Sequence, residues 1–593
     1  MLAETIAGTH RTVTAPFAEA LVAAGRRHDD LVVLSADLSK WTDVLPFAQS
    51  FGDRFIQVGM AEQNLIGIAG GLAKAGWRPV VVGFGVFLTR RAYDQISMSL
   101  ATGPSNAVIV GFLPGVTSRF RGTHQAIEDA ALMRAVPGMR VLDPADATEL
   151  RQALDTALDR GGLTYIRAMR GQVPLLFDDP TPELPSHRVL ADGAHDVAVV
   201  STGLATTWVR EARELGAAAA HLHVASLKPF PAQVVADLAR SRRRVITVEN
   251  HVRHAGLGAA VALALADHGV GVPVTRLGLS DAWQAYGTPD YVRDQAGLSP
   301  TAIAEVIRGR RAIAPAGHPA QAAPQPIVAW SGHSHDLARR IRHNVVHMCR
   351  RRGQGYAGQG LQLADVMAVV FADVLRHGAD GQPTDRFVLS TGHSAIALYA
   401  TLGALGVYDD EQLATYGADG SAIEESPLED APGFEVTGGS LGQGPSQAVG
   451  IALGERSAGR DVHVICQLSD GELDEGAVWE AFMAAAHHQL ANLTFFVDYN
   501  GEQADGAIDD VMGLEPVVDK LTAFGLHVQR LDGHDHDALR AAFATARSVA
   551  SPAALVLDTV PGRGAPTLEA HEKVHYVRVD DDVWAQALAE VAP

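Results

Sequence analysis

Two apolar runs in the last third of the chain, each followed at once by polar residues, place the strongest constraint on the fold. The run VHVICQLS ends at Asp470 and Gly471, and the run LTFFVDY ends at Asn500. A helical pattern over residues 476–488 separates them, which predicts a βαβ unit with parallel strands. Ligands of open α/β sheets bind at the carboxyl ends of the strands, where Asp470 and Asn500 both lie. A carboxylate and an amide oxygen there can share one small cation whose other positions are available to phosphate oxygens.

Composition excludes several classes of protein. At 593 residues the chain is too long for one hydrophobic core, and its 47% hydrophobic and 20% charged residues are those of a globular protein. A net charge of −20 argues against non-specific nucleic-acid binding. The cysteines, Cys349 and Cys466, are too few for a disulfide framework and fit a reducing compartment. No apolar run reaches the length of a membrane span or of a signal peptide, so we expect a cytoplasmic protein with no membrane or nucleic-acid partner.

Strand-like and helical segments alternate along most of the chain, which predicts an α/β fold of three doubly wound domains. We expect the first domain over residues 1–185, the second over 186–312 and the third over 329–593. Residues 313–328 are rich in Ala, Pro and Gln and show no periodicity, which indicates an extended linker.

A glycine-rich turn precedes the Asp470 motif in the third domain. The stretch FEVTGGSLGQGPSQAVGIALG has five glycines between Gly438 and Gly450, just before a helix of small residues. Glycine lets backbone N–H groups approach phosphate oxygens closely, and a helix N-terminus adds a favourable dipole. The turn and the Asp470 motif together predict a site for a phosphorylated cofactor and its cation.

These motifs resemble the transketolase family, whose thiamine diphosphate signature pairs Asp-Gly with a later Asn. DRFVLSTGHSAIALYATLGALG resembles the family's diphosphate-binding domain, and FIQVGMAEQNLIGIAGGLA resembles its pyrimidine-binding domain. The middle block, with SLKPFP and VENHVRHAGLGAAVA, resembles the family's C-terminal domain. A conventional transketolase runs diphosphate, pyrimidine, C-terminal. This chain is similar to the two subunits of a split transketolase fused in reversed order, with residues 313–328 as the joint.

The resemblance implies thiamine diphosphate and Mg²⁺, or Ca²⁺, as cofactors. It implies that the cation is bound by Asp470, Asn500 and the backbone of Glu502. Glu62 matches the family glutamate that hydrogen-bonds the aminopyrimidine and activates the cofactor, and an apolar cleft would suit that carboxylate by raising its pKa. The other positions that match cofactor contacts are Asp37, Phe84, Phe87, Gly439, Leu441 and Gly471.

The resemblance also implies proton-transferring histidines and a homodimer with active sites at its interface. His124, His393 and His575 match family histidines, although His571 competes with His575 for the last assignment. Glu475 and Glu480 match acids that the family places between its two cofactors.

The substrate contacts of the family are changed. Tyr356 and Glu425 stand where the family has histidines, Phe120 and Arg121 stand near the place of an acid, and Trp41 replaces a serine. The arginine expected near Thr14 is absent. The arginines that remain as anion ligands are Arg121, Arg167 and Arg170. We infer a substrate different from those of the pentose phosphate reactions.

The predicted function is transfer of a two-carbon ketol unit from a ketose or related donor to an aldehyde, in a specialised pathway. One alternative is a decarboxylating acyloin synthase with a 2-oxo acid donor. The loss of sugar-binding histidines favours it, whereas the LSTGH and SLGQG motifs count against it. A second alternative is a non-catalytic pseudoenzyme, against which Glu62, Asp470 and Asn500 all count.

Overall fold

The computed structural model describes residues 10–103, 105–310, 327, 329–379, 382–571 and 574–592. The chain forms two compact units, Met1–Pro319 and Ala320–Pro593. All but one residue of the predicted linker, 313–328, lies outside the described residues.

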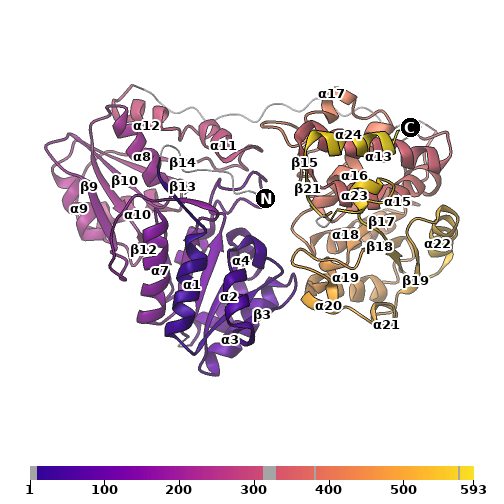
Figure 1. The fold of residues 1–593 in the computed structure, drawn as a ribbon, viewed down its shortest axis with the longest axis horizontal. Helices are drawn as coiled ribbons and strands as arrows, with labels where there is room; N and C mark the ends of the chain where they lie inside the picture. The colour runs from indigo at the N-terminus through magenta and orange to yellow at the C-terminus, as the bar shows by residue number, and fades with distance from the viewer. Residues whose placement is uncertain are drawn as a thin grey trace. The chain divides into compact units, whose positions relative to one another are not determined.

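The first part of unit 1 is built on a mostly parallel sheet of order β12-β6-β7-β5-β4-β2-β3, in which only β12 runs antiparallel to its neighbour (Figure 1). Its central strands are buried on both faces, which explains why they read as continuous apolar runs. The strands are β2 (Leu31–Ser35), β3 (Phe55–Gln57), β4 (Arg78–Phe84), β5 (Val108–Phe112), β6 (Arg140–Leu142), β7 (Thr164–Ala168) and β12 (Ser226–Lys228), and a separate ladder joins β1 (Thr12–Thr14) to β8 (Gln172–Pro174). The helices are α1 (Pro16–Arg27), α2 (Leu45–Ser50), α3 (Glu62–Lys74), α4 (Gly85–Arg91), α5 (Tyr93–Gln95), α6 (Asp129–Ala135) and α7 (Ala147–Arg160).

The second part of unit 1 has a sheet of order β14-β13-β10-β11-β9, parallel except at its β9 edge. Its strands are β9 (His187–Ala191), β10 (Val197–Ser201), β11 (Ala220–Val224), β13 (Arg244–Val252) and β14 (Val274–Leu279), and its helices are α8 (Ala205–Glu214), α9 (Ala232–Arg240), α10 (Leu257–Asp267), α11 (Pro289–Gln295) and α12 (Pro300–Ile307).

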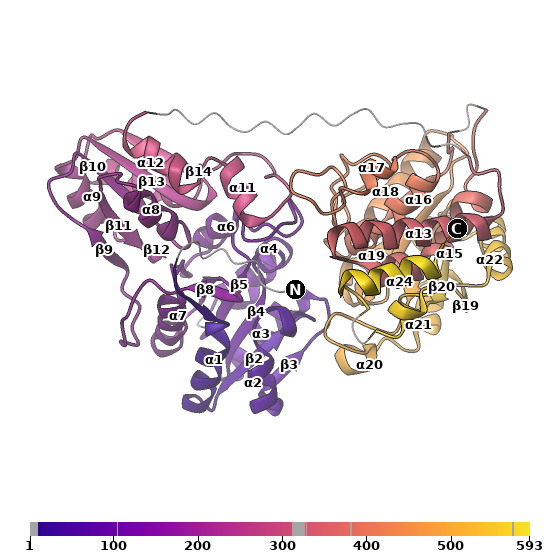
Figure 2. The same ribbon diagram turned by 45° about the horizontal axis from the view of Figure 1, so that its top comes forward.

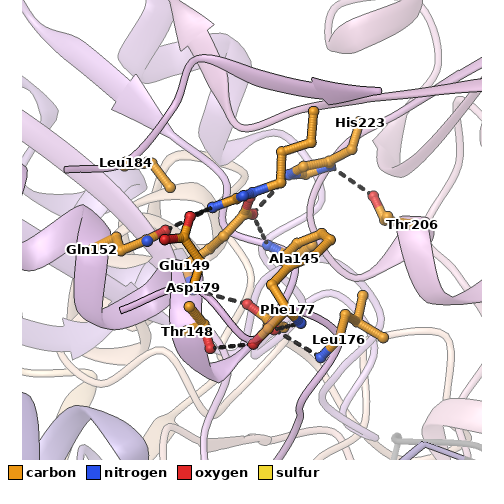
Figure 3. Close-up of polar contacts among 12 residues, drawn as sticks. Ala145, Thr148, Glu149, Gln152, Leu176, Phe177, Asp179, Leu184, Thr206 and His223 are labelled. Carbon is orange, nitrogen blue, oxygen red and sulfur yellow. Dashed lines mark hydrogen bonds and ion pairs between the residues drawn. The ribbon is translucent and has the colours of Figure 1, made fainter. Parts of the chain in front are cut away.

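A buried polar cluster connects the second sheet of unit 1 to α7. We call Glu149, His223, Arg188 and Thr206 the Glu149 cluster, of which Figure 3 labels Glu149, His223 and Thr206. Glu149 Oε2 lies 2.8 Å from His223 Nε2, and Oε1 accepts from Arg188 Nε at 2.7 Å. His223 Nδ1 in turn lies 2.8 Å from Thr206 Oγ1. Burial opposes ionisation of Glu149, but the charges and hydrogen bonds of His223 and Arg188 lower its pKa.

Unit 2 is built on a parallel sheet of order β16-β17-β18-β20-β19. Its strands are β16 (Arg386–Leu389), β17 (Val464–Ser469), β18 (Leu493–Tyr499), β19 (His527–Asp532) and β20 (Ala553–Asp558), and β15 (Gln354–Gly355) pairs with β21 (Val577–Arg578). The helices are α13 (Ser334–Arg352), α14 (Ala357–Gln362), α15 (Ala364–Val369), α16 (Ala395–Ala404), α17 (Asp410–Leu413), α18 (Gln443–Ser457), α19 (Gly476–His487), α20 (Ile508–Val511), α21 (Val517–Ala523), α22 (His536–Ser548), α23 (Pro566–Glu569) and α24 (Asp581–Glu590).

Helices cover both faces of this sheet. Phe495 and Val497 of β18 pack against the α18 and α19 layer, whereas their neighbour Phe496 packs against the opposite layer with α16 and α22. Figure 1 shows β17 and β18 between α16 and α19. Figures 1 and 2 both show α24 alongside α13, which it contacts. Because both faces are covered, a ligand has access only at the ends of the strands.

The predicted α/β fold with three doubly wound domains is confirmed, as is the predicted βαβ unit, whose elements are β17, α19 and β18. No helix in the described ranges is both long enough and apolar enough to span a membrane.

Candidate active site

Asp470 and Asn500 lie together at one edge of the unit 2 sheet. Asp470 follows β17 and Asn500 follows β18, the neighbouring parallel strand. The Asp470 carboxylate accepts backbone N–H groups from Gly471 at 2.7 Å, Asn500 at 2.9 Å and Gly501 at 3.0 Å. An ionised carboxylate has about four acceptor positions, so these contacts leave room for a cation.

A second acid lies behind this edge. Asp498 of β18 is buried, and it accepts from Thr559 Oγ1 at 2.5 Å and from the side-chain amide of Gln362. Burial raises the pKa of Asp498 to about 6. Burial, followed by the charge of Asp498, raises the pKa of Asp470 to about 8. In the part of the chain that the structure describes, no arginine, lysine or histidine forms an ion pair with either acid.

This donor set fits a hard divalent cation. Asp470, the Asn500 amide oxygen and the backbone carbonyl of Glu502 offer oxygen ligands, which Mg²⁺ and Ca²⁺ prefer. Among the described residues no group of three or more His, Cys, Asp or Glu could hold a metal ion. A cation at Asp470 would therefore need further ligands from outside the protein, and diphosphate oxygens are suited to that.

The glycine-rich turn lies against the Asp470 motif, although about thirty residues separate the two in sequence. Gly442 has φ +88°, which L side chains rarely adopt, and its N–H donates to Glu472 Oε1 at 2.6 Å. A Cβ on Gly392 would come within 2.6 Å of Gly439 Cα, so the backbone approaches closely here. Leu441, in the same turn, is partly buried. The turn leads directly into α18, whose N-terminus favours an anion.

Two predicted histidines form an aromatic group with Tyr356. The ring centroids of His393 and His575 are 5.2 Å apart, and those of Tyr356 and His575 are 5.6 Å apart and nearly perpendicular. Because His575 contacts His393, this geometry favours His575 over His571 as the partner of His393.

Glu425 is fully buried beside this group. It accepts a hydrogen bond from Tyr576 Oη at 2.9 Å, and the Tyr576 ring lies 4.9 Å from that of Tyr356. Tyr356 and Glu425, the two residues expected to replace family histidines, are thus linked through Tyr576, which sequence reasoning missed.

Helix α14 carries two further residues that sequence reasoning missed. The Gln359 amide contacts Nδ1 of His575, and the Gln362 amide contacts Asp498. Both side chains are buried and lie one helical turn apart. Two glutamines at i and i+3 in the otherwise small and apolar run GYAGQGLQL were the available signal.

In unit 1, Glu62 is the first residue of α3 and is buried. Its Oε2 accepts from Arg91 Nη1 at 2.7 Å, and only 5% of the Glu62 side chain and 9% of the Arg91 side chain are exposed. The expectation of an apolar cleft is therefore wrong in one respect, because a buried guanidinium faces the carboxylate. Sequence reasoning missed Arg91, which lies 29 residues beyond Glu62.

His124 lies within an aromatic group in unit 1. Its ring centroid is 5.0 Å from that of Phe120, 5.1 Å from Phe87 and 6.1 Å from Phe84. Burial, with a smaller contribution from Arg90, lowers the pKa of His124 to about 4. At neutral pH the imidazole is therefore uncharged and can both donate and accept a proton.

The remaining unit 1 candidates differ in setting. Asp37 is fully buried with φ +52°, and its N–H donates to Gln57 Oε1 at 2.7 Å. The Arg170 guanidinium lies 5.4 Å from the centre of the Trp41 ring. Arg121, in the same loop as His124, is buried.

Arg167 does not have the setting of an anion ligand. Its guanidinium is buried between Asp129 at 2.9 Å and Asp143 at 3.0 Å, and it also donates to the carbonyl of Asn250 at 3.0 Å. We correct that interpretation: Arg167 forms ion pairs with two buried acids of the protein itself.

The two acids predicted to lie between cofactors also differ. Glu475 is buried at the N-terminal end of α19, where a Cβ on Gly442 would come within 3.0 Å of its own Cβ. Glu480, on the same helix, is exposed in unit 2.

Three family models match the chain. They are the transketolase pyrimidine binding domain over residues 10–174, the transketolase C-terminal domain over 187–303 and the transketolase thiamine diphosphate binding domain over 333–590. The order of these matches agrees with the predicted reversal.

Similar proteins include two putative uncharacterised transketolase family proteins of Sinorhizobium fredii. One, y4mO, is 44% identical over 270 residues, covering 44% of this chain and 97% of the relative. The other, y4mN, is 39% identical over 316 residues, covering 52% and 91%. A third relative is the SqwH subunit of a 6-deoxy-6-sulfo-D-fructose transketolase from a Clostridium species, 35% identical over 304 residues, covering 50% and 92%.

Proposed function

Because this chain belongs to the transketolase family and is a thiamine diphosphate-dependent, transketolase-like enzyme, we propose that it transfers a two-carbon ketol unit from a ketose-like donor to an aldehyde, with Mg²⁺ as its cation. One observation supports this most strongly. The acidic pair at the strand ends, with which no arginine, lysine or histidine of the described residues forms an ion pair, is joined through α14 to the histidine pair His393 and His575. A cation site together with a pair of histidines suits carbonyl chemistry better than a cation site or a histidine pair alone.

In this proposal, the cofactor supplies an electron sink for breaking and forming carbon–carbon bonds beside a carbonyl. Asp470, Asn500 and the Glu502 carbonyl hold the cation. Glu62 exchanges a proton with the pyrimidine, and Arg91 holds that carboxylate in place. The residues that contact the rest of the cofactor are Asp37, Phe84, Phe87, Gly439, Leu441 and Gly471.

The histidines carry protons to and from the substrate in this proposal. His124 is a candidate for these transfers, and its ring, which its low pKa keeps uncharged at neutral pH, can accept a hydrogen bond from one substrate hydroxyl or donate one to another. His393 and His575, with ring centroids 5.2 Å apart, can bind neighbouring hydroxyl groups of one substrate.

We propose a modified sugar as the donor. By the resemblance, Tyr356 and Glu425 replace family histidines, and both contact Tyr576, which supports a change in how hydroxyl groups are bound. Arg121 and Arg170 are the candidates for an anionic substituent of the sugar. The name of the SqwH relative gives its substrate as a sulfonated fructose, so sulfonated ketoses belong among the donors to test.

The test is incubation of the full chain with thiamine diphosphate, Mg²⁺, an aldehyde acceptor and a panel of donors. The panel includes plain, phosphorylated and sulfonated ketoses and 2-oxo acids, and products are identified by mass. Elongation of the acceptor by two carbons without carbon dioxide supports ketol transfer. Carbon dioxide release from a 2-oxo acid supports the acyloin synthase alternative. The absence of any product, together with no binding of thiamine diphosphate, contradicts the enzyme proposal.

We also propose that the active sites form between two copies of the chain. Mixing Glu62→Ala and Asp470→Ala proteins tests this, because each variant alone damages one half of the site. If the halves come from different chains, hybrid dimers have one intact site, and random mixing restores about a quarter of wild-type activity. If both halves come from one chain, the mixture remains inactive.

A further inference from the structure

We infer that Gln362 is a positioning residue that orients the Asn500 amide so that its oxygen, and not its nitrogen, is presented to the cation. This inference rests on the proposed cation site and adds to it a residue outside the ligand set. Gln362 ends α14, is fully buried, and bridges Asp498 and Asn500.

Asp498 sets the orientation of the Gln362 amide, and the Gln362 amide in turn sets the orientation of the Asn500 amide. Gln362 Nε2 donates to Asp498 Oδ2, while Thr559 Oγ1 donates to the other carboxylate oxygen, so the NH₂ end of the Gln362 amide faces Asp498. The other end of the Gln362 amide, Oε1, then faces Asn500 and accepts from its Nδ2 at 3.5 Å. This leaves Oδ1 as the end of the Asn500 amide that faces away from Gln362.

The position of Asn500 Oδ1 agrees with a ligand role. It accepts the Glu502 backbone N–H at 2.8 Å, and an amide oxygen has a second lone pair for a cation. Asn500 also donates its backbone N–H to Asp470 Oδ2 at 2.9 Å, so the residue is fixed beside the carboxylate with which it would share the cation.

An asparagine needs such a partner more than an aspartate does. The two ends of an amide have nearly the same shape, but only the oxygen binds Mg²⁺, so a freely rotating amide presents the wrong end part of the time. Partners behind metal ligands typically contribute about 10–100-fold to metal affinity through such orientation.

The experiment measures Mg²⁺ binding by calorimetry to the full chain, freed of cations with a chelator and saturated with thiamine diphosphate. Gln362→Met keeps the size of the side chain and removes both hydrogen bonds. We expect about 10–100-fold weaker Mg²⁺ binding. The matched control is Gln359→Met, one turn earlier on α14, which contacts His575 and should change Mg²⁺ affinity by less than about twofold.

An Asn500→Asp background separates orientation from general support of the fold. A carboxylate has oxygen at both ends, so the Gln362→Met loss should shrink to less than about threefold in that background. An equal loss in both backgrounds, or a folded Gln362→Met protein with wild-type affinity, overturns the inference. If Gln362→Met does not fold, Gln362→Asn keeps an amide but withdraws it by one methylene. It should still weaken binding about tenfold or more, and wild-type affinity in that variant overturns the inference.

The two proposals fail in different ways. If the wild-type chain binds no Mg²⁺ with thiamine diphosphate, the proposed cation site fails and this inference fails with it. If the wild-type chain binds and Gln362→Met binds equally well, only the role of Gln362 is lost.

Discussion

Two groups of buried acids in this protein differ in the charged side chains that lie beside their carboxylates. In the Glu149 cluster of unit 1, the carboxylate has His223 and Arg188 beside it, and its pKa is lowered. At the strand ends of unit 2, Asp470 and Asp498 have no cationic side chain paired with them among the described residues, and the pKa of Asp470 is raised to about 8.

Glu149 is ion-paired within the folded protein, whereas Asp470 and Asp498 form no ion pair among the described residues and would be stabilised by a bound cation. A buried carboxylate with its partners in place stabilises the packing of neighbouring elements, and removing one partner is strongly destabilising. Two buried carboxylates without a cation are costly to the folded protein and become favourable when a divalent ion binds. The contrast supports a stabilising role for the Glu149 cluster and is consistent with the cation binding that we propose for the Asp470 site.

The largest effect is expected at Asp470. Asp470→Ala should weaken Mg²⁺ and thiamine diphosphate binding by more than about 100-fold, because loss of a ligand exceeds the usual cost of losing a partner behind it. Activity should fall below detection. Calorimetric titration measures the binding, and Asp581→Ala, an exposed acid on α24, is the control. The melting temperature of the ligand-free variant should equal or exceed that of the wild type, and a marked decrease would contradict the assignment.

Glu62 tests whether a buried acid that is ion-paired within the protein can still have a functional role. It is paired with Arg91 much as Glu149 is paired, yet we propose that it acts on the cofactor. Glu62→Gln should reduce turnover by about 10²–10⁴-fold, the usual contribution of a proton-transferring group. Steady-state kinetics measures this, and Glu19→Gln on α1 serves as the control. Normal turnover would show that an ion-paired buried acid here is structural after all.

Glu149→Gln tests the other side of the comparison. It leaves Arg188 and His223 without their buried acid, so we expect unit 1 to lose about 3–5 kcal/mol of unfolding free energy. Denaturant titration followed by circular dichroism measures the loss. Mg²⁺ affinity should stay within about twofold of wild type, since Glu149 lies in unit 1 and the cation ligands lie in unit 2. A variant as stable as the wild type would refute the assigned role.

The smallest effect is the pH dependence of that destabilisation. The pKa of Glu149 is lowered in the folded protein, so its contribution is fully present above its unfolded pKa of about 4.3 and is lost as pH falls further. The stability difference between the wild type and Glu149→Gln should therefore shrink as the pH falls below about 4.3. A difference that grows on acidification would reverse the sign of the effect and contradict the ion-paired description.

Most of the fold was predictable from local patterns. The apolar runs that end at Ser469 and Tyr499 were sufficient to predict neighbouring parallel strands, because strands buried on both faces read as continuous apolar sequence. The short edge strands β9 and β12 were not predicted, since their pairing depends on partners distant in sequence and their own patterns are weak.

The side-chain contacts that surround the candidate site were harder to predict from the sequence. Arg91 and Gln362 were missed because a buried polar side chain leaves little trace in a sequence until its partner is known. Arg167 was misjudged for the same reason, as its partners Asp129 and Asp143 are 38 and 24 residues away. Whether a charged residue binds a ligand or a neighbouring side chain depends on which groups the fold brings within hydrogen-bonding distance.

The sequence by itself determined the family, the α/β fold and the strand-end position of Asp470 and Asn500, because spacing and apolar periodicity are local properties. Only the tertiary structure decided which buried charges are neutralised within the protein. It placed His223 and Arg188 beside Glu149, and Arg91 beside Glu62. It gave Asp498 an amide from Gln362 and Asp470 the backbone N–H groups of Gly471, Asn500 and Gly501. The physical reason is that the cost of a buried charge depends on what lies within a few ångströms of it, and only the folded chain sets those neighbours.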